Sequence, residues 1–522
     1  MTDPHNPDAA DLPAAVRVIA DGYAFTGPVL ELGAATEGAT AFPAARVRIP
    51  LGVLNRHGLV AGATGTGKTK TLQLIAEQLS AQGVPVFLAD IKGDVSGIAA
   101  PGTPDDRVTA RAAEVGQQWT PQGCPTEFYA LGGQGTGIPL RATVTSFGPL
   151  LLAKVLELNE TQEASLGLIF HYADKAGLEL YDLKDLSAVI GFLTSPEGKE
   201  ELKGIGGLSA ATAGVILRSL TVLDNEGAGT FFGEPEFDTA DLLRTAADGR
   251  GTVSVLELPA VQDRPRLFST FLMWLLADLY QELPEVGDLD RPKLVFFFDE
   301  AHLLFNGASK AFLEAITRTV RLIRSKGVGI FFVTQTPEDV PGNVLAQLGN
   351  RVQHALRAFT PDDAKALRAT VSTFPRSSYD LAEVLTGLGT GEAVVTVLSE
   401  RGAPTPVAAT RLRAPQSLMG PLEPTALQAA VDGSPLAPRY RDAIDRESAF
   451  EKLAARPPAR EEPVAEPREA PQRRSSAGQD EEGGLLGSLL RNPALKSFAR
   501  SAGTQLGREI TRSLFGTSRR RR

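Results

Sequence analysis

A glycine-rich segment near the N-terminus has the spacing of a phosphate-binding loop. Residues 62–69 read Gly-Ala-Thr-Gly-Thr-Gly-Lys-Thr, which matches the pattern G-x-x-x-x-G-K-[ST]. Glycines let backbone N–H groups turn inward around phosphate oxygens, where a Cβ would obstruct them. Lys68 would place its ammonium against the β- and γ-phosphates, and the Thr69 hydroxyl would ligate Mg²⁺. We therefore predict a nucleotide-binding site formed by Gly62, Ala63, Thr64, Gly65, Thr66, Gly67, Lys68, Thr69 and Lys70.

The surroundings of this loop distinguish it from other glycine-rich segments. An apolar strand is expected over residues 57–61, and residues 68–82 have the apolar spacing of an amphipathic helix. A helix that begins at the loop adds the positive end of its dipole to a phosphate site. The GKT ending excludes a dinucleotide-binding loop, which requires G-x-G-x-x-G. An ordinary glycine-rich turn is the alternative, and the flanking strand and helix argue against it.

Two further strand ends carry side chains that suit nucleotide hydrolysis. Asp299 and Glu300 follow an apolar strand over residues 294–298. An aspartate at such a position holds Mg²⁺ through water, and the next glutamate activates the attacking water. Gln335 follows the strand over residues 329–334, where its amide would contact the γ-phosphate or that water. The alternatives are solvated acids at a strand end and a glutamine that caps a loop; the pairing with the glycine-rich loop favours the catalytic interpretation.

Composition limits the class of protein. Of 522 residues, 43% are hydrophobic and 22% charged, which excludes a wholly disordered or fibrous chain. The single cysteine, Cys124, excludes a disulfide framework and a cysteine zinc site. The net charge is −9, although residues 493–522 carry eight basic residues against one acid, so the rest of the chain is strongly acidic and is not a general nucleic-acid binder. With neither a leader pattern nor an apolar stretch of about 20 residues, we expect a cytoplasmic protein.

Short apolar strands alternate with helical segments along most of the chain. This alternation predicts an α/β fold with a mostly parallel central sheet covered on both faces. Residues 16–50 contain β-like runs, at 16–19, 29–32 and 45–49, and predict a small β-rich N-terminal segment. The expected organisation is a flexible arm over 1–15, this β-rich segment over 16–50, a core over 51–415 with a helical insertion at about 150–225, C-terminal helices over 416–455, a disordered linker over 456–482 and a basic amphipathic tail over 483–522.

Four segments of the sequence together resemble one known family. They are residues 55–69, residues 90–94 (Asp-Ile-Lys-Gly-Asp), residues 298–302 (Phe-Asp-Glu-Ala-His) and residues 333–337 (Val-Thr-Gln-Thr-Pro). This set is similar to the HerA-like branch of the HerA/FtsK superfamily of P-loop ATPases, and more closely to bacterial proteins described as helicase HerA-like C-terminal domain proteins. The segments that also resemble this group are 158–163, 183–186 and 445–449, so the resemblance covers residues 20–455 and 485–515.

The resemblance implies a RecA-like P-loop NTPase core, assembled as a hexameric ring with ATP and Mg²⁺ between subunits. It implies Lys68 and Thr69 on phosphate and Mg²⁺, Asp299 on Mg²⁺, Glu300 as the base and Gln335 as a sensor. It also implies an arginine supplied by the neighbouring subunit, for which Arg324 matches best and the other candidates are Arg318 and Arg321. Arg56 is a separate candidate for a nucleotide or interface contact. One departure is that residues 16–50 are far shorter than the N-terminal β-barrel of archaeal HerA translocases.

These observations predict an Mg²⁺-dependent ATP hydrolase that works as a DNA translocase or helicase-like motor, with DNA coupling resting on the family resemblance. The alternative, favoured by the acidic body and the tail, is a nucleotide-switched or membrane-associated assembly ATPase that acts on protein partners. A nucleotide-binding protein without turnover is a third alternative, which the presence of Glu300 disfavours. The tail has an apolar stripe and a basic stripe, so it would contact DNA, an anionic membrane or its own ATPase core.

Overall fold

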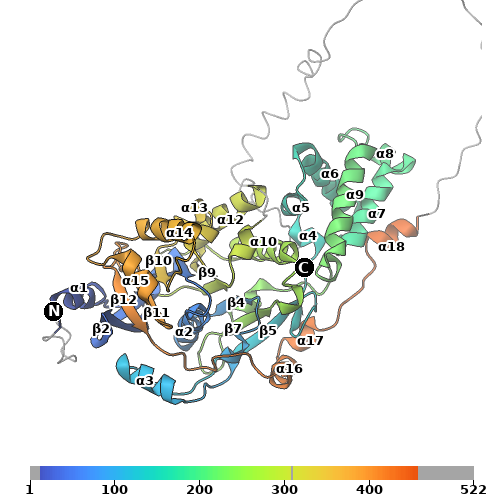
Figure 1. Ribbon diagram of the computed structural model, residues 1–522. Helices are drawn as coiled ribbons and strands as arrows, with labels where there is room; N and C mark the ends of the chain where they lie inside the picture. The colour runs from blue at the N-terminus through green and yellow to red at the C-terminus, as the bar shows by residue number, and fades with distance from the viewer. Residues whose placement is uncertain (1–11, 288, 307–309, 457–522) are drawn as a thin grey trace, which may run out of the picture.

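The computed structural model describes residues 12–287, 289–306 and 310–456 (Figure 1). The predicted linker and basic tail, and most of the predicted N-terminal arm, lie outside these residues. The strands are β1 Val29–Glu37, β2 Thr40–Pro50, β3 Gly58–Ala61, β4 Val86–Asp90, β5 Thr126–Leu131, β6 Ile138–Leu140, β7 Val253–Glu257, β8 Leu294–Phe298, β9 Val328–Thr334, β10 Asn350–Gln353, β11 Glu392–Thr396 and β12 Ala408–Leu412.

The helices fall into groups that follow the chain. Those before the insertion are α1 Ala14–Gly22, α2 Lys68–Ala81, α3 Asp106–Glu114 and α4 Val144–Phe147. Those between residues 149 and 225 are α5 Pro149–Val155, α6 Glu160–Ala176, α7 Leu183–Thr194, α8 Pro196–Glu201 and α9 Ala210–Asn225. The remaining helices are α10 Pro265–Glu282, α11 His302–Phe305, α12 Lys310–Ile323, α13 Gly342–Leu345, α14 Pro361–Ser372, α15 Leu381–Gly387, α16 Pro424–Asp432, α17 Ala437–Tyr440 and α18 Ala449–Ala454.

All strands of the described chain belong to one sheet, in the order β2-β1-β12-β11-β10-β3-β9-β8-β4-β7-β5-β6. From β10 to β6 every neighbouring pair is parallel, whereas the pairs among β2, β1, β12, β11 and β10 are antiparallel. The prediction of a mostly parallel sheet in a RecA-like P-loop fold is therefore confirmed. Strand β9 lies between β3 and β8, so the strand that ends before Gln335 separates the strand of the glycine-rich loop from the strand that ends at Asp299.

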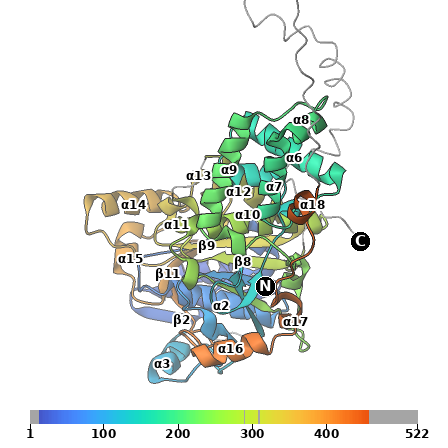
Figure 2. The ribbon, with the colours of Figure 1, turned by 90° about the vertical axis from the view of Figure 1, so that its right-hand side faces the viewer.

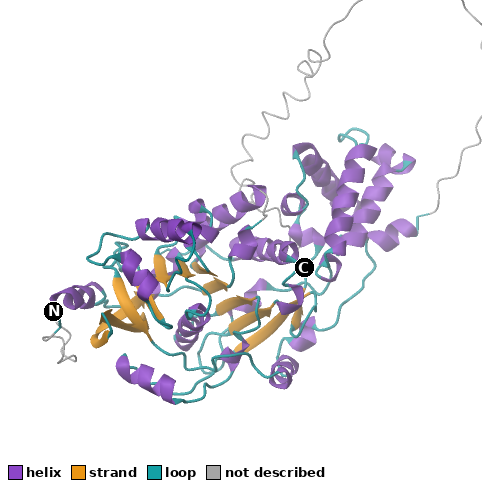
Figure 3. Ribbon diagram, viewed as in Figure 1, coloured by secondary structure: helices purple, strands orange, loops and turns teal. Residues whose placement is uncertain are grey.

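The central strands are buried on both faces because helices cover each side. Every residue of β8 and β9 is buried, as expected for continuous apolar runs in a parallel sheet. Phenylalanine rings stack between them, with 5.2 Å between the ring centroids of Phe297 and Phe331. Helix α2 lies on one face of the sheet, and helices α10 and α12 lie on the other (Figures 2 and 3).

The N-terminal segment differs from the prediction at its start. Residues 16–19, expected to be a strand, lie inside helix α1. Val16 and Ile19 are buried and three residues apart, which is the spacing of one helical face, whereas Val18 is 59% exposed. Residues 16–19 read Val-Arg-Val-Ile, and so short a run does not distinguish a strand from a helix, so the predicted strand is wrong. Strands β1 and β2 form no separate module, because β1 pairs with β12 and extends the main sheet.

The helical insertion projects from the sheet next to helix α10 (Figure 1). Helices α5–α9 occupy the range expected for it, between β6 and β7. Its packing is apolar, with Leu186, Ile190 and Ile216 fully buried. After β12 the chain runs along the sheet through α16 and α17 to α18, the last described helix, which packs against α7. These C-terminal helices therefore connect the sheet to the insertion. None of the helices in the described ranges is both long and apolar enough to span a membrane.

Candidate nucleotide-binding and catalytic site

Four parallel strands bring the predicted site residues to one edge of the sheet. Strands β3, β9, β8 and β4 are neighbours, so the loops that follow them leave the sheet side by side. Backbone hydrogen bonds connect these loops: the N–H of Gly62 donates to Thr334 O (3.2 Å), and the N–H of Ala301 donates to Val333 O (2.9 Å). The glycine-rich loop, Gln335 and the pair Asp299–Glu300 therefore lie at the same edge.

The glycine-rich loop has a backbone that only glycine tolerates. Gly62, Gly65 and Gly67 all have positive φ angles, of 153°, 79° and 111°. A Cβ on Gly62 would lie 2.4 Å from the Cβ of His354, and one on Gly67 would lie 3.3 Å from the backbone nitrogen of Gly391. Helix α2 begins directly after Gly67, and no side chain of the described residues caps it. Its first N–H groups are therefore available to an anion such as a phosphate.

Lys68 and Thr69 stand at the first turn of α2, as predicted. The Lys68 side chain is buried, and its Nζ donates to Ala63 O inside the loop (3.3 Å). Burial lowers the pKa of Lys68, although the negative charge of Glu300 acts in the opposite direction. The Thr69 hydroxyl donates to Asp94 Oδ2 (3.4 Å). Lys70 is half-buried, and burial lowers its pKa against the opposing charges of Asp94 and Asp90.

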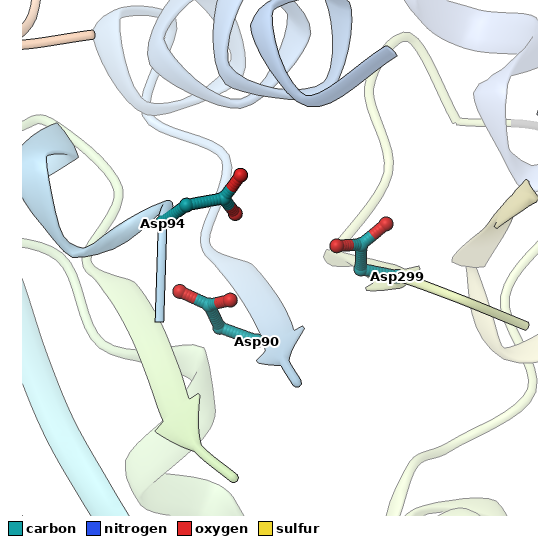
Figure 4. Close-up of side chains that lie close together, drawn as sticks. All are labelled: Asp90, Asp94 and Asp299. Carbon is teal, nitrogen blue, oxygen red and sulfur yellow. The ribbon is translucent and has the colours of Figure 1, made fainter. Parts of the chain in front are cut away.

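Three aspartates converge beside Thr69. Oxygens of Asp90, Asp94 and Asp299 lie within 4.8 Å of one another, and their carboxylates point toward a common space (Figure 4). Asp299 Oδ2 and Asp94 Oδ1 are buried without a hydrogen-bond partner among the described residues. Burial, with neighbouring negative charge, raises the pKa of Asp299 to about 7 and that of Asp90 to about 6. Unpartnered oxygens and uncompensated charge fit a bound divalent cation, which prefers oxygen ligands.

Glu300, which directly follows Asp299, is buried, has an unusual backbone conformation and forms an ion pair. It is 4% exposed and has a φ of 46°, a left-handed conformation that is rare for a glutamate. Its Oε1 forms an ion pair with Lys92 Nζ. Its Oε2 lies 3.2 Å from His302 Nδ1, but the angle forms no hydrogen bond and both atoms lack a partner. This carboxylate lies at the edge of the site, directly after Asp299 in the chain.

The predicted sensor and the predicted arginine lie at opposite edges. Gln335 is exposed and directly follows β9, on the side of the glycine-rich loop. Arg324 is exposed and precedes β9, so it lies at the other edge, together with Arg56 before β3. That edge is fixed by His57, whose Nε2 lies 2.7 Å from Val320 O while its Nδ1 accepts from the N–H of Ile330. Arg324 and the chain's own glycine-rich loop therefore lie at opposite ends of the parallel strands.

Several residues of the site were not predicted from the sequence. Asp90, Lys92 and Asp94 belong to residues 90–94, which the sequence indicated only through the family resemblance. Glu257 is the last residue of β7, as Asp90 is the last residue of β4. Glu257 lies opposite Asp90 in the sheet register, and its Oε1 has no partner among the described residues. Burial, with the charge of Asp90, raises the pKa of Glu257 to about 8. The signal that could have identified Asp90 was its position at the end of an apolar strand.

Comparisons with known proteins are consistent with this geometry. Residues 37–522 match the family described as "Helicase HerA-like C-terminal". A probable helicase of Methanocaldococcus jannaschii is 29% identical over 153 residues, which are 27% of this chain and 28% of that protein. The DNA double-strand break repair helicase HerA of Sulfurisphaera tokodaii is 34% identical over 98 residues, 19% of each chain. The chain thus aligns with less than a third of the length of these relatives.

The solved structures of two further proteins are also similar to the chain. The plasmid coupling protein TrwB in complex with a non-hydrolysable ATP analogue is 16% identical, and the match covers 76% of this chain and 97% of TrwB with a TM-score of 0.49. VirB4 of Thermoanaerobacter pseudethanolicus is 15% identical, with coverages of 77% and 98% and a TM-score of 0.44. The match of residues 37–522 spans nearly the whole chain, and the protein therefore belongs to the helicase HerA-like C-terminal family, as a HerA-like member of the HerA/FtsK superfamily.

Proposed function

We propose that this protein is an Mg²⁺-dependent ATPase that couples ATP hydrolysis to movement along DNA or to its remodelling. The observation that carries the hydrolytic part is the convergence of Thr69, Asp94, Asp299 and Glu300 beside an uncapped, phosphate-type helix start. An isolated glycine-rich turn would have no reason to lie against this cluster of carboxylates. The third alternative, binding without turnover, is disfavoured because Glu300 lies at this edge of the sheet.

The chain's own residues suffice to describe the chemical step. The N–H groups of the loop and of α2, together with Lys68, would hold the β- and γ-phosphates. Glu300 would accept a proton from a water whose oxygen bonds to the γ-phosphorus, while the bond from that phosphorus to the β–γ bridging oxygen breaks. ADP and phosphate are the products. Gln335 directly follows β9, which lies between β3 and β8, and its amide would orient the water or the γ-phosphate.

Thr69, Asp94, Asp299 and Asp90 are the residues that would hold the magnesium ion. When bound, Mg²⁺ supplies positive charge that draws electron density from the phosphate oxygens. The fit rests on the unpartnered oxygens of Asp94 and Asp299, which a cation would satisfy. Thr69 donates to Asp94 in the absence of the ion, and its oxygen lone pairs remain available for coordination.

The position of Arg324 supports an oligomer with the site at a subunit boundary. The exposed guanidinium lies at the edge opposite the glycine-rich loop, so a head-to-tail arrangement would bring it to the next subunit's phosphates. There it would stabilise charge on the transferring phosphoryl group. A hexameric ring is the arrangement that the family resemblance implies, and we include it in the proposal.

Mixing two inactive variants tests this arrangement. Arg324→Ala keeps its own phosphate loop, and Lys68→Ala keeps its arginine. An equal mixture that exchanges subunits should recover activity that neither variant has alone, because Lys68→Ala neighbours supply the arginine. Arg318→Ala, an exposed arginine on the preceding helix α12, is the matched control and should retain activity. A mixture as inactive as its components would contradict a role for Arg324 in trans.

DNA coupling is supported by a relative that is named as a DNA repair helicase, over 19% of its length. The test is the rate of ATP hydrolysis with and without duplex DNA at several salt concentrations. We expect stimulation that weakens as salt rises, because phosphate contacts release counterions. Hydrolysis that requires Mg²⁺ but ignores DNA would remove the DNA part and favour the assembly ATPase acting on protein partners, which the net charge of −9 also favours.

A further inference from the structure

Lys92 forms an ion pair with the carboxylate that is proposed as the general base. Its Nζ contacts Oε1 of Glu300, and the two side chains are 47% and 6% exposed. A general base must accept a proton from water, which it does poorly while an ammonium occupies one of its oxygens. The pair must therefore open before catalysis. The exposure of the two partners indicates that the lysine, and not the glutamate, is the one that can move.

The backbone beneath Lys92 is fixed, although its side chain tip is not. The carboxylate of Asp90 accepts hydrogen bonds from the N–H groups of Lys92 (3.2 Å), Gly93 (2.8 Å) and Val95 (2.8 Å). Three bonds to one buried carboxylate hold the turn in a single shape. The four-carbon stem of a lysine can still swing its ammonium through several ångströms, since its three donors have no fixed plane.

This turn lies next to the place where the γ-phosphate would lie. Asp94, two residues after Lys92, accepts from the hydroxyl of Thr69 on the first turn of α2. Lys92 and Glu300 both act electrostatically on Lys68, whose ammonium would hold the β- and γ-phosphates. Lys92 therefore lies among the groups that would surround the terminal phosphate.

From these contacts we infer that Lys92 is a positioning residue that reads the γ-phosphate. Lys92 holds Glu300 through Oε1, as the structure shows; when ATP is bound, its ammonium moves to a γ-phosphate oxygen and leaves Glu300 free to accept a proton from water. After hydrolysis and loss of phosphate, Lys92 returns to Glu300. The base is then free only while a terminal phosphate is present. This inference rests on the proposed ATP hydrolysis.

A purely structural ion pair is the competing explanation. An ion pair with a half-exposed lysine contributes little to stability. A structural role would also affect ATP and ADP equally, because neither nucleotide would contact the lysine. A role in reading the γ-phosphate predicts a change that is confined to the nucleotide that carries one. The ratio of the two affinities therefore separates the explanations.

The experiment compares Lys92→Met with Lys92→Arg in the full-length chain. Affinities for ADP and for the β,γ-imido analogue of ATP are measured by calorimetry with Mg²⁺, and kcat and KM are measured for ATP. Lys92→Met should lose about tenfold in affinity for the analogue, as expected for one charge-assisted hydrogen bond, with ADP affinity unchanged. It should also lower kcat, whereas Lys92→Arg should keep most of both. Lys92→Gln replaces Lys92→Met if that variant does not fold.

Lys184 is the matched control, because it is 41% exposed and pairs with Asp182, Asp445 and Glu451 away from the site. Lys184→Met should leave both affinities and kcat at the wild-type values. If Lys92→Met keeps the wild-type ratio of analogue to ADP affinity, the inference is wrong and the proposed function stands. If the wild-type chain hydrolyses no ATP, the proposed function fails and takes this inference with it.

Discussion

Helices α2 and α7 begin in different ways, although both are mostly buried. Helix α7 follows Asp182, whose carboxylate accepts from the N–H groups of Lys184 (2.9 Å) and Asp185 (3.1 Å), while Asp185 accepts in return from the N–H of Asp182 (3.1 Å). This reciprocal capping box satisfies the helix start from within. Helix α2 follows Gly67 and has no side-chain cap among the described residues. Its N–H groups are left for a ligand.

Two buried aspartates repeat this contrast. Asp185 in the insertion is fully buried, and its oxygens accept from the N–H groups of Tyr181 and Phe450 and from the hydroxyl of Ser448. Asp299 at the sheet edge is 3% exposed, and its Oδ2 has no partner among the described residues. Burying an unpartnered charged oxygen costs stability. We conclude that Asp185 in the insertion is satisfied by other residues of the chain, whereas Asp299 at the sheet edge keeps an oxygen without a partner, as the proposed cation site requires.

The largest effect is expected at the sheet edge and should be catalytic. Glu300→Gln removes the proposed base without changing the size of the side chain. We expect kcat for ATP to fall by about 10²- to 10⁴-fold, the usual contribution of a general base, while nucleotide affinity persists. Steady-state hydrolysis and calorimetric binding measure the two effects. Equal turnover by wild type and variant would show that Glu300 is not the base, and unchanged urea unfolding serves as the folding control.

The next effect should be structural and confined to the insertion. Asp185→Ala leaves the buried N–H groups of Tyr181 and Phe450 without an acceptor. We expect the free energy of unfolding to fall by about 3 kcal/mol, because unpaired buried donors keep their full desolvation penalty. Asp299→Asn should instead leave unfolding unchanged or slightly improved, and weaken Mg²⁺-dependent nucleotide binding. Urea unfolding and nucleotide titration of both variants measure the changes in stability and in nucleotide binding. A loss of stability in Asp299→Asn would mean that Asp299, like Asp185, stabilises the fold, and would contradict the difference between the two regions.

The sequence was sufficient for the parts of the site that are contiguous in the chain. The glycine-rich loop, Lys68 and Thr69 lie within eight consecutive residues, and Asp299 and Glu300 directly follow an apolar strand. Alternation of strands and helices was likewise enough for a mostly parallel sheet. Both features depend on local spacing, which a single sequence contains.

Contacts that depend on strand order could not be predicted in the same way. Lys92 meets Glu300 only because β4 lies beside β8, although more than 200 residues separate them. Parallel neighbours are joined by crossovers of varied length, so spacing along the chain does not give their order. The strand predicted over residues 16–19 was wrong for a different reason, because the short run Val-Arg-Val-Ile fits the spacing of both a strand and a helix. The position of Arg324, at the sheet edge opposite the glycine-rich loop, could likewise be inferred only from the direction of β9.

A smaller effect is expected from the unpartnered carboxyl of Glu257 at the sheet edge. Its folded pKa of about 8 is raised above the ordinary 4.5, so this group contributes stability at low pH that is lost as pH rises toward 8. Glu257→Gln stays neutral and avoids this loss. Between pH 6 and pH 8 the wild type should therefore lose on the order of 2 kcal/mol relative to the variant.

Urea unfolding at several pH values, with EDTA and without nucleotide, measures this difference. Glu282→Gln, at the exposed end of α10, is the control and should track the wild type. A difference between Glu257→Gln and wild type that stays constant with pH would mean that Glu257 is paired in solution. Glu257 would then no longer count among the unsatisfied carboxylates that distinguish the sheet edge from the insertion.

The smallest effect concerns the start of helix α6 in the insertion. Asn159 Oδ1 accepts from the N–H of Gln162 (3.0 Å), and Gln162 Oε1 accepts from the N–H of Asn159 (3.0 Å). Asn159→Ala should lower the free energy of unfolding by about 1 kcal/mol, whereas Asn159→Asp should retain the cap. Because this cap is complete without a ligand, the loss should be the same with and without MgATP. A loss that grew or vanished with MgATP would mean that nucleotide binding reaches the insertion, and the two regions could no longer be treated as independent.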